Sequence, residues 1–367
     1  MAFSWTLRRY RDGDEQAIVE LLNSAQVGTA HGKPHSLEYW RWKYAKNPAG
    51  SPIISLAECD NRIIGHYGIT PVIMKIGNAY VTASCAHDGA THPDHEGRGV
   101  FSSVVNRAYL DAGQNAMHVT YGFSDADLGP TYGRYEHLGH ICFTKTMIKV
   151  LDWEPFLARY IPIEFLTRAA GSALGTIRRS RSSKGDLTIE RVTSFDERVD
   201  TLWEKVSQNF RVIVRRKHTY LNWRYVAHPD ANYTIYAALE GDVVLGYCVL
   251  EQRQHKNARL GLLVDVLGVQ DRRDVVGCLI DRAVEYSERE NLDAVQFRIS
   301  ERHPYAPLFR RAGFITISHR DEALYATINL PGSPLDEKRV FPQALLLSQS
   351  HFLKEKANWF MTYGDEF

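Results

Sequence analysis

The sequence predicts a mixed α/β protein made of two tandem copies of one unit, each a mixed, mostly antiparallel sheet flanked by helices. Three observations support this: a length of 367 residues, which exceeds what one compact core usually holds, an internal repeat, and the same order of predicted elements in both halves. We expect residues 1–150 to form a catalytic domain, 151–186 a connecting helix and basic linker, and 187–367 a degenerate second domain.

The repeat centres on a Trp-x-Tyr motif. Residues 42–48 read Trp-Lys-Tyr-Ala-Lys-Asn-Pro, and residues 223–229 read Trp-Arg-Tyr-Val-Ala-His-Pro, an offset of 181 positions that also relates Gly65 to Gly246. Several matches at one offset within so short a stretch indicate an internal duplication.

Periodicity defines the elements of the first copy. In chain order, these are a strand Thr6–Tyr10, a helix with Ile18, Leu21 and Leu22 on one face, a short helix that carries the repeat motif, strands Ile53–Cys59, Ile63–Ile76 and Tyr80–Thr91, a helix with Phe101, Val104 and Ala108 on one face, a strand Met117–Phe123, a helix near 132–138 and a terminal strand pair. Asp60-Asn61 is the predicted hairpin turn. The second copy begins near Leu187 and repeats this order.

Composition excludes several classes of protein. The formal net charge of +1 gives no reason to expect a nucleic-acid partner. The five cysteines contain no Cys-x-x-Cys pair, and the histidines form no ligand pattern, so we expect no disulfide framework and no metal. No apolar run approaches the roughly 20 residues of a membrane helix, and the N-terminus has no secretory apolar core. We expect a cytoplasmic protein.

The linker has two interpretations. A packed helix followed by a solvated basic stretch, Arg178–Lys184, is the simpler one. A membrane-surface helix is the alternative, but the acidic residues among 152–168 disfavour it.

The stretch Thr91–Phe101, Thr-His-Pro-Asp-His-Glu-Gly-Arg-Gly-Val-Phe, leaves a predicted strand, turns through two glycines and opens a helix. Unpaired backbone N–H groups and the helix dipole at such an N-terminus bind phosphate. A tight strand-to-helix turn that needs glycine only for steric reasons is the alternative interpretation.

This stretch resembles the pyrophosphate loop of the GNAT acetyltransferase superfamily, whose pattern is Arg/Gln-x-x-Gly-x-Gly/Ala after a strand that ends in Pro. The matching positions are Pro93, Gly97, Arg98, Gly99 and Val100. Glu96 departs from the family's usual Arg or Gln, and Phe101 departs from its last Gly or Ala. The resemblance implies acyl-CoA as co-substrate, bound by Thr91, His92, Gly97, Arg98, Gly99, Val100, Phe101, Ser124 and Asp125.

A second motif, Tyr135-Glu136-His137-Leu138-Gly139, is similar to the Tyr-Glu-Lys-Leu-Gly-Phe signature of the same superfamily. The resemblance implies that Tyr135 protonates the departing CoA thiolate; an ordinary amphipathic-helix tyrosine is the alternative. The second copy has Phe309 at this position and no glycine in 269–275. We therefore expect only the first copy to transfer acyl groups.

The attacking amine must lose a proton. His87 and Asp88 precede the glycine loop, and the resemblance implies an acid at this position, which favours Asp88. Asp88 would need a raised pKa, whereas His87 titrates near neutrality. Neighbours on a strand point to opposite faces, so only one can face the site; for either one, a structural role stays open. His66 and His92 are weaker candidates, and a strand N–H near 90–92 is the expected oxyanion donor.

The expected acceptor is a small-molecule amine. The basic run Arg211, Arg215, Arg216 and Lys217 is interpreted either as a solvated face or as a clamp for an anionic acceptor, such as the diphosphate of a nucleotide sugar. The ending Trp359–Asp365 looks similar to that of tandem GNAT proteins encoded with surface-polysaccharide genes, which implies a nucleotide-linked amino sugar. The alternatives are a peptide or protein amine, and a non-catalytic acyl-CoA or nucleotide sensor, which Glu96 supports.

Overall fold

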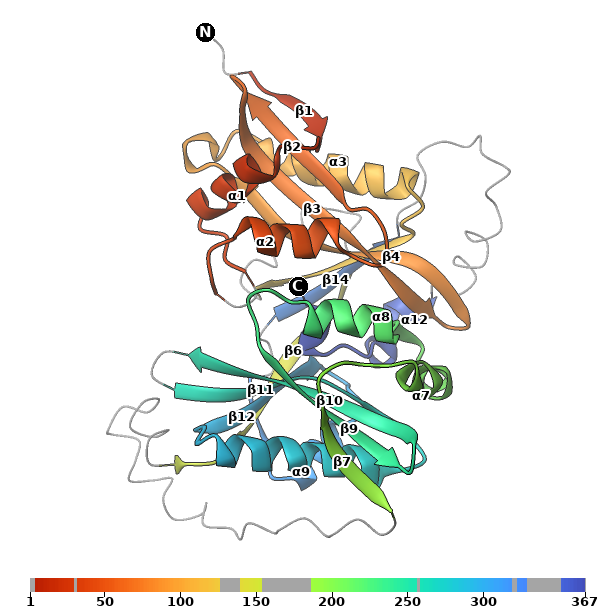
Figure 1. The fold of residues 1–367 in the computed structure, drawn as a ribbon. Helices are drawn as coiled ribbons and strands as arrows, with labels where there is room; N and C mark the ends of the chain where they lie inside the picture. The colour runs from red at the N-terminus through yellow and green to blue at the C-terminus, as the bar shows by residue number, and fades with distance from the viewer. Residues whose placement is uncertain are drawn as a thin grey trace.

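The computed structural model describes residues 4–29, 32–125, 139–153, 186–255, 258–318, 322–328 and 351–366. Within these residues, the strands form one 14-stranded mixed sheet that runs through two lobes (Figure 1), in the order β1-β2-β3-β4-β5-β14-β6-β12-β11-β10-β9-β7, with β8 beside β3 and β13 beside β6. The predicted fold class is confirmed.

The first lobe follows the predicted order of elements closely. Its elements are β1 (Thr6–Arg9), α1 (Glu15–Ser24), α2 (Leu37–Trp40), a π-turn η1 (Arg41–Ala45), β2 (Ile53–Cys59), β3 (Arg62–Ile76), β4 (Ala79–Thr91), a 3-10 turn η2 (Pro93–His95), α3 (Val100–Gln114), β5 (Val119–Asp125) and β6 (Gly139–Val150). Asp60 and Asn61 have φ of 49° and 60°, as the predicted two-residue hairpin turn requires.

The second lobe repeats this order. Its elements are β7 (Leu187–Val192), α7 (Arg198–Val206), η5 (Ser207–Asn209), β8 (Val212–Val214), α8 (His218–Leu221), a second π-turn η6 (Asn222–Val226), β9 (Tyr233–Glu240), β10 (Val243–His255), β11 (Ala258–Gly268), α9 (Arg273–Arg289), β12 (Ala294–Ser300), α10 (Ala306–Arg311), β13 (Ile315–Ser318), β14 (Glu322–Ile328), α12 (His351–Lys354), η8 (Lys356–Asn358) and η9 (Tyr363–Asp365).

Helices cover both faces of the sheet in each lobe (Figure 1). In the first lobe, α3 buries Val104, Val105 and Ala108 against one face, while α1 and η1 bury Leu22 and Tyr44 against the other. The apolar residues of α3 recur every three to four positions, so one stripe of the helix is buried. In the second lobe, α9 and α7 take the equivalent places.

The two lobes exchange strands. β14, from the end of the chain, pairs along its whole length with β5 of the first lobe and also with β6. The C-terminal part of β6 in turn pairs with β12 and β13 of the second lobe. The expectation that each copy closes its own sheet with a local strand pair is therefore wrong: the alternating pattern of a strand specifies its faces but not its partner. The division at 150 and 187 stays a prediction.

The repeat motifs contact each other at the centre of the molecule. Trp42 Nε1 donates to the carbonyl of Trp223 at 2.7 Å, and Trp223 Nε1 donates to the carbonyl of Trp42 at 2.9 Å. The two rings are stacked with centroids 5.1 Å apart. Such reciprocal contacts are those of a two-fold interface, so the duplication inferred from the sequence is also a pseudo-symmetry of the structure.

Candidate functional site

The parallel strands β4 and β5 separate into a wedge. They pair only where Ala83–Cys85 lies beside Val119–Tyr121. Beyond this point β4 runs on to Thr91, while β5 is paired on its other side with β14 up to Asp125. Two strands that part at their carboxyl ends create a crevice at the edge where open α/β sheets bind ligands.

The glycine loop lies at the mouth of this wedge. It joins the end of β4 to α3, and Gly97 and Gly99 have φ of 71° and 80°. Side chains other than glycine rarely adopt such values. An added Cβ would meet no atom within 4 Å at either position. The backbone conformation therefore explains both glycines, and the space around them is open.

The N-terminus of α3 is available to an anion. Among the described residues, no carbonyl accepts a hydrogen bond from the backbone N–H groups of Val100 and Phe101, and the first turn of α3 contains no acidic side chain. The preceding residues, Glu96–Gly99, are exposed. Free N–H groups and the dipole of a 15-residue helix together form an anion site.

The other predicted donor-binding residues divide into three groups. Thr91 ends β4, and its buried Oγ1 has no partner among the described residues. Ser124 is buried on β5, with Asp125 as the last residue of that strand. The amide of His92 donates to the carbonyl of Ile64 at 2.8 Å, so the expected oxyanion role for that amide is wrong. Tyr135 lies outside the described residues.

Asp88 does not have the properties of a general base. It is buried, Lys43 Nζ lies 2.9 Å from Oδ1, and the hydroxyl of Tyr44 donates to Oδ2 at 2.7 Å. Burial alone would raise the pKa of this carboxyl, but the nearby charge of Lys43 and the Tyr44 hydrogen bond hold the pKa well below its usual value. The raised pKa that a base role requires is absent, and the structure indicates a structural carboxylate.

Neighbouring side chains on a strand were expected to point to opposite faces, which would separate His87 from Asp88. A bulge in β4 breaks this alternation. Gly68 pairs with His87 and His66 pairs with Ala90, so β4 has one extra residue here, and Asp88 has φ of 55°. Both side chains consequently meet Tyr44, since the His87 ring lies 5.7 Å from the Tyr44 ring. Burial and the Lys43 charge lower the pKa of His87 well below its usual value, which keeps it neutral.

His66, one of the weaker sequence candidates, has better geometry for accepting a proton. It is fully buried on β3, and its Nδ1 lies 2.7 Å from the Asp88 carbonyl oxygen, which assigns the proton to Nδ1. Nε2 is then a lone-pair acceptor, and it has no partner among the described residues. Burial lowers the pKa of His66 to about 4. No periodicity in the sequence singled out His66. The bulge at Asp88, which only the structure reveals, gives His66 its partner.

The second lobe contains the equivalent wedge. β11 and β12 pair in parallel only up to Leu263 and Phe297. The registers Gly65–Thr91 and Gly246–Gly268 place Asp265 at the position equivalent to Asp88. The Tyr225 hydroxyl donates to Asp265 at 3.2 Å, as Tyr44 does to Asp88.

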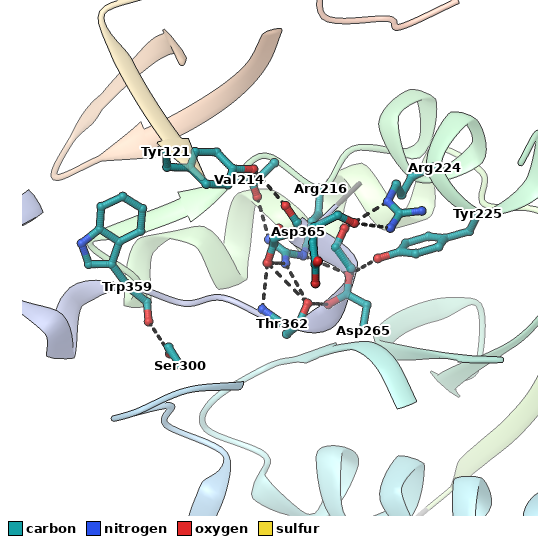
Figure 2. Close-up of polar contacts among 12 residues, drawn as sticks. Tyr121, Val214, Arg216, Arg224, Tyr225, Asp265, Ser300, Trp359, Thr362 and Asp365 are labelled. Atoms are coloured by element: carbon teal, nitrogen blue, oxygen red, sulfur yellow. Dashed lines mark hydrogen bonds and ion pairs between the residues drawn. The ribbon is translucent and has the colours of Figure 1, made fainter. Parts of the chain in front are cut away.

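This second wedge is filled by the chain itself. The Ser300 amide donates to the carbonyl of Met361 at 3.2 Å, and the Thr362 hydroxyl donates to Asp265 Oδ1 at 3.2 Å. Figure 2 shows Thr362 and Asp365 clustered with Asp265 and Arg216. Segment 359–366 thus occupies the crevice between β11 and β12.

The predicted anionic clamp does not assemble. Arg216 is buried, with Nε 3.0 Å from Asp265 and Nη2 2.7 Å from Asp365 (Figure 2). Lys217 is paired with Glu204 at 3.2 Å, and the Arg211 guanidinium lies over the Phe352 ring. Arg215 is half-buried on the same short segment. Arg216 as an acceptor-binding residue is wrong, because two carboxylates already satisfy its charge.

The second lobe also lacks the anion site. Arg272 forms the N-cap of α9 and is paired with Asp274, an acidic residue in the first turn, at 2.9 Å. Phe309 is fully buried and stacks on Phe297 with ring centroids 4.2 Å apart. A phenyl ring in this place has no proton to donate.

The described residues contain no group of three or more His, Cys, Asp or Glu side chains that could hold a metal. No helix in the part of the chain that the structure describes is long and apolar enough to cross a bilayer.

Comparison with known proteins identifies the first lobe. Residues 6–137 match the family described as an acetyltransferase (GNAT) domain. No curated protein matches the chain. The match includes the glycine loop and Tyr135 and ends before β6, so the residues that carry the sequence resemblance lie within it.

Solved structures match the tandem arrangement over both lobes. A GCN5-related N-acetyltransferase from Anabaena variabilis has a TM-score of 0.64 at 11% identity, covering 89% of this chain and 73% of that chain. A probable N-acyltransferase from Enterococcus faecalis has a TM-score of 0.64 at 10% identity, with the same coverage. Saccharomyces cerevisiae N-myristoyltransferase with bound myristoyl-CoA has a TM-score of 0.58 at 10% identity, covering 89% and 83%. At these identities the structures establish the fold, and the family match identifies residues 6–137 as a GNAT acetyltransferase domain.

Proposed function

We propose that this chain, whose residues 6–137 match a GNAT acetyltransferase domain, transfers an acyl group from acyl-CoA to a primary amine in the wedge between β4 and β5. One observation carries the proposal: of two equivalent wedges, segment 359–366 fills the second, whereas the first lies beside an available helix N-terminus. Catalysis therefore belongs to the first lobe.

The donor is held mainly by backbone groups. The diphosphate of CoA binds the amides of Val100 and Phe101 at the start of α3, and the open space around Gly97 and Gly99 lets it approach closely. Glu96 is exposed and places a negative charge nearby, which weakens donor binding, while Arg98 offsets that charge. The thioester then extends into the wedge between β4 and β5.

Proton transfer uses two groups. The ammonium form of the acceptor loses a proton to Nε2 of His66, through a water molecule, and the adjacent Asp88 carboxylate stabilises the imidazolium that forms. The neutral amine attacks the thioester carbonyl, and the C–S bond breaks as the tetrahedral intermediate collapses. Tyr135 gives its proton to the CoA thiolate, and the second proton lost from the acceptor nitrogen returns through solvent to the Tyr135 oxygen.

The acceptor is proposed to be a small polar amine. Where β6 meets residues of the second lobe, a hollow of about 590 Å³ is lined by both signs of charge, including Glu301, Glu355, Lys354 and Lys356. This hollow lies across β14 from the wedge between β4 and β5, so the proposal of a small amine rests on the sequence resemblance. A nucleotide-linked amino sugar, a substrate of polysaccharide biosynthesis, stays a prediction, and it now lacks the support of a basic clamp.

Release of CoA in the presence of a panel of amines tests the function. We expect acyl-CoA-dependent release with at least one amino sugar, and a fall in kcat of about 100-fold for Tyr135→Phe, as for the loss of a general acid. Phe309→Tyr, at the equivalent position of the second lobe, is the matched control and leaves kcat unchanged. No release with any amine, or full activity in Tyr135→Phe, contradicts the proposal.

A non-catalytic acyl-CoA sensor is the second candidate, and the exposed carboxylate of Glu96 at the loop favours it. A sensor binds acyl-CoA and leaves the thioester intact. Incubation of the protein with acyl-CoA and amines, followed by mass spectrometry of the thioester, distinguishes the two functions.

A further inference from the structure

Segment 359–366 is anchored in the second lobe by several independent bonds. Arg216 Nη2 pairs with Asp365 at 2.7 Å, Arg224 Nε donates to the carbonyl of Gly364 at 3.1 Å, and Ser300 Oγ donates to the carbonyl of Trp359 at 2.9 Å. All these groups lie in or beside the second wedge (Figure 2). The segment is therefore fixed to a rigid scaffold.

The fit of this segment depends on one glycine. A Cβ added at Gly364 would lie 2.0 Å from the Tyr225 hydroxyl and 3.2 Å from the carbonyl of Val264. The first distance is far inside van der Waals contact, so any side chain at this position displaces the segment unless the hydroxyl is removed. Gly364 and Tyr225 both belong to the second lobe and lie outside the proposed catalytic groups.

The same segment reaches the first lobe. The hydroxyl of Tyr121 donates to the carbonyl of Asp365 at 3.2 Å, and the Tyr121 ring meets the Trp359 ring edge-on at 6.4 Å. Tyr121 is fully buried and lies opposite Cys85, the last pair before β4 and β5 part. The contact is therefore made at the vertex of the first wedge.

We propose that segment 359–366 is a positioning element for acyl transfer: seated in the filled wedge, it holds Tyr121 and so fixes the opening between β4 and β5. This inference rests on the proposed function of the first wedge. The strand geometry explains why such a support is needed. The ladder between β4 and β5 ends at Tyr121, and from there β14 and this contact support β5.

Four variants of the full chain test the proposal: Gly364→Ala, Tyr121→Phe, Tyr225→Phe and the double variant Gly364→Ala/Tyr225→Phe. We expect Gly364→Ala and Tyr121→Phe each to raise KM for acetyl-CoA about fivefold to tenfold, the effect of one lost hydrogen bond, with kcat within about twofold. Tyr225→Phe alone leaves KM unchanged. In the double variant the hydroxyl is gone, so KM returns toward the wild-type value.

Gly261→Ala is the matched control, because its Cβ would lie 2.5 Å from Ser287 Oγ at a second-lobe site away from the segment. It lowers Tm without changing KM. An unchanged KM in Gly364→Ala, or no rescue by Tyr225→Phe, overturns the proposal. So does additivity in KM of Gly364→Ala and Tyr121→Phe, since two changes to one link must be coupled.

Hydrogen exchange of the β5 amides separates this proposal from the proposed function, because it needs no acyl-CoA. Faster exchange over Val119–Asp125 in Gly364→Ala, with wild-type rates in Gly261→Ala, supports the positioning role even if the chain proves to transfer no acyl group. Unchanged exchange at β5 in Gly364→Ala contradicts it.

Discussion

The first lobe has a glycine loop and an available helix N-terminus beside the wedge between β4 and β5, whereas the second lobe fills the wedge between β11 and β12 with segment 359–366. The two wedges share a buried carboxylate, Asp88 or Asp265, that accepts a hydrogen bond from the tyrosine of the repeat motif. They differ in the glycine loop, which the second lobe lacks. Shared features thus belong to the fold, and the differing features belong to acyl transfer.

The largest effect is expected from replacing the buried carboxylate that the two lobes share. Asp88→Asn removes the carboxylate that pairs with the buried ammonium of Lys43, and we expect a loss of about 3–5 kcal/mol in the free energy of unfolding. Asp265→Asn should cost less, because Arg216 keeps Asp365 as a partner. Urea unfolding of both variants measures the difference. Equal losses of unfolding free energy in the two variants would contradict the claim that the second carboxylate partner of Arg216 softens the loss of Asp265.

A substitution in the glycine loop, which only the first lobe has, should affect activity instead of stability. Gly99→Asp places a carboxylate at the proposed phosphate site, and we expect kcat/KM for acyl-CoA to fall about 100-fold, the scale of losing preorganised backbone donors. Gly241→Asp is the matched control, since Gly241 also has a positive φ, of 57°, and open space around it. Wild-type kcat/KM in Gly99→Asp would exclude the α3 N-terminus as the donor site.

A pH experiment sharpens the comparison at His66, which Tyr247 replaces at the 181-residue offset. The folded pKa of His66 is lowered to about 4, so the unfolded chain binds this proton first and stability falls as pH drops from about 6.5 toward 4. His66→Gln should remove about 2 kcal/mol of the stability difference between pH 7 and pH 5. Tyr247→Phe should leave that difference unchanged, and an equal change in both variants would contradict the assignment.

Asp88 behaves in the opposite way on acidification. Its folded pKa is depressed, so its stabilising contribution is fully present above the usual carboxyl pKa near 4 and is lost only at lower pH. Between pH 5 and 7 Asp88 therefore adds nothing to the slope. The lowered pKa values of the buried histidines contribute to the expected acid sensitivity in this range.

The smallest effect is expected for the basic run. Arg211 is exposed and Lys217 forms a partly exposed ion pair, so alanine at either position should change KM for a nucleotide-linked amino sugar by less than about fivefold. Steady-state kinetics with that acceptor measure the change. A 50-fold rise in KM would support the anionic clamp, which the burial of Arg216 argues against.

Local patterns predicted most of the fold. The strands Ile53–Cys59 and Thr6–Arg9, the Asp60-Asn61 turn and the start of α3 are set by periodicity and by turn residues near them in the chain. The exchange of β14 and β6 between lobes was not predictable, because pairing between strands so far apart in the chain leaves no mark in the alternation of either strand.

The candidate site was predicted only in part. The glycine loop followed from its residue types, since Gly97 and Gly99 supply the left-handed backbone of the turn. Asp88 and Arg216 were assigned functional roles because the sequence shows charges but not the buried partners that satisfy them. His66 was given little weight because its position depends on a bulge, which no alternating pattern reveals.

Calorimetry with CoA tests the central claim most directly, with wild type, Gly99→Asp and Gly241→Asp compared under one buffer. We predict one CoA per chain for wild type and Gly241→Asp and no measurable binding for Gly99→Asp, because the glycine loop and the available helix N-terminus belong to the first lobe. Two CoA molecules per chain, or undiminished binding by Gly99→Asp, would contradict the account.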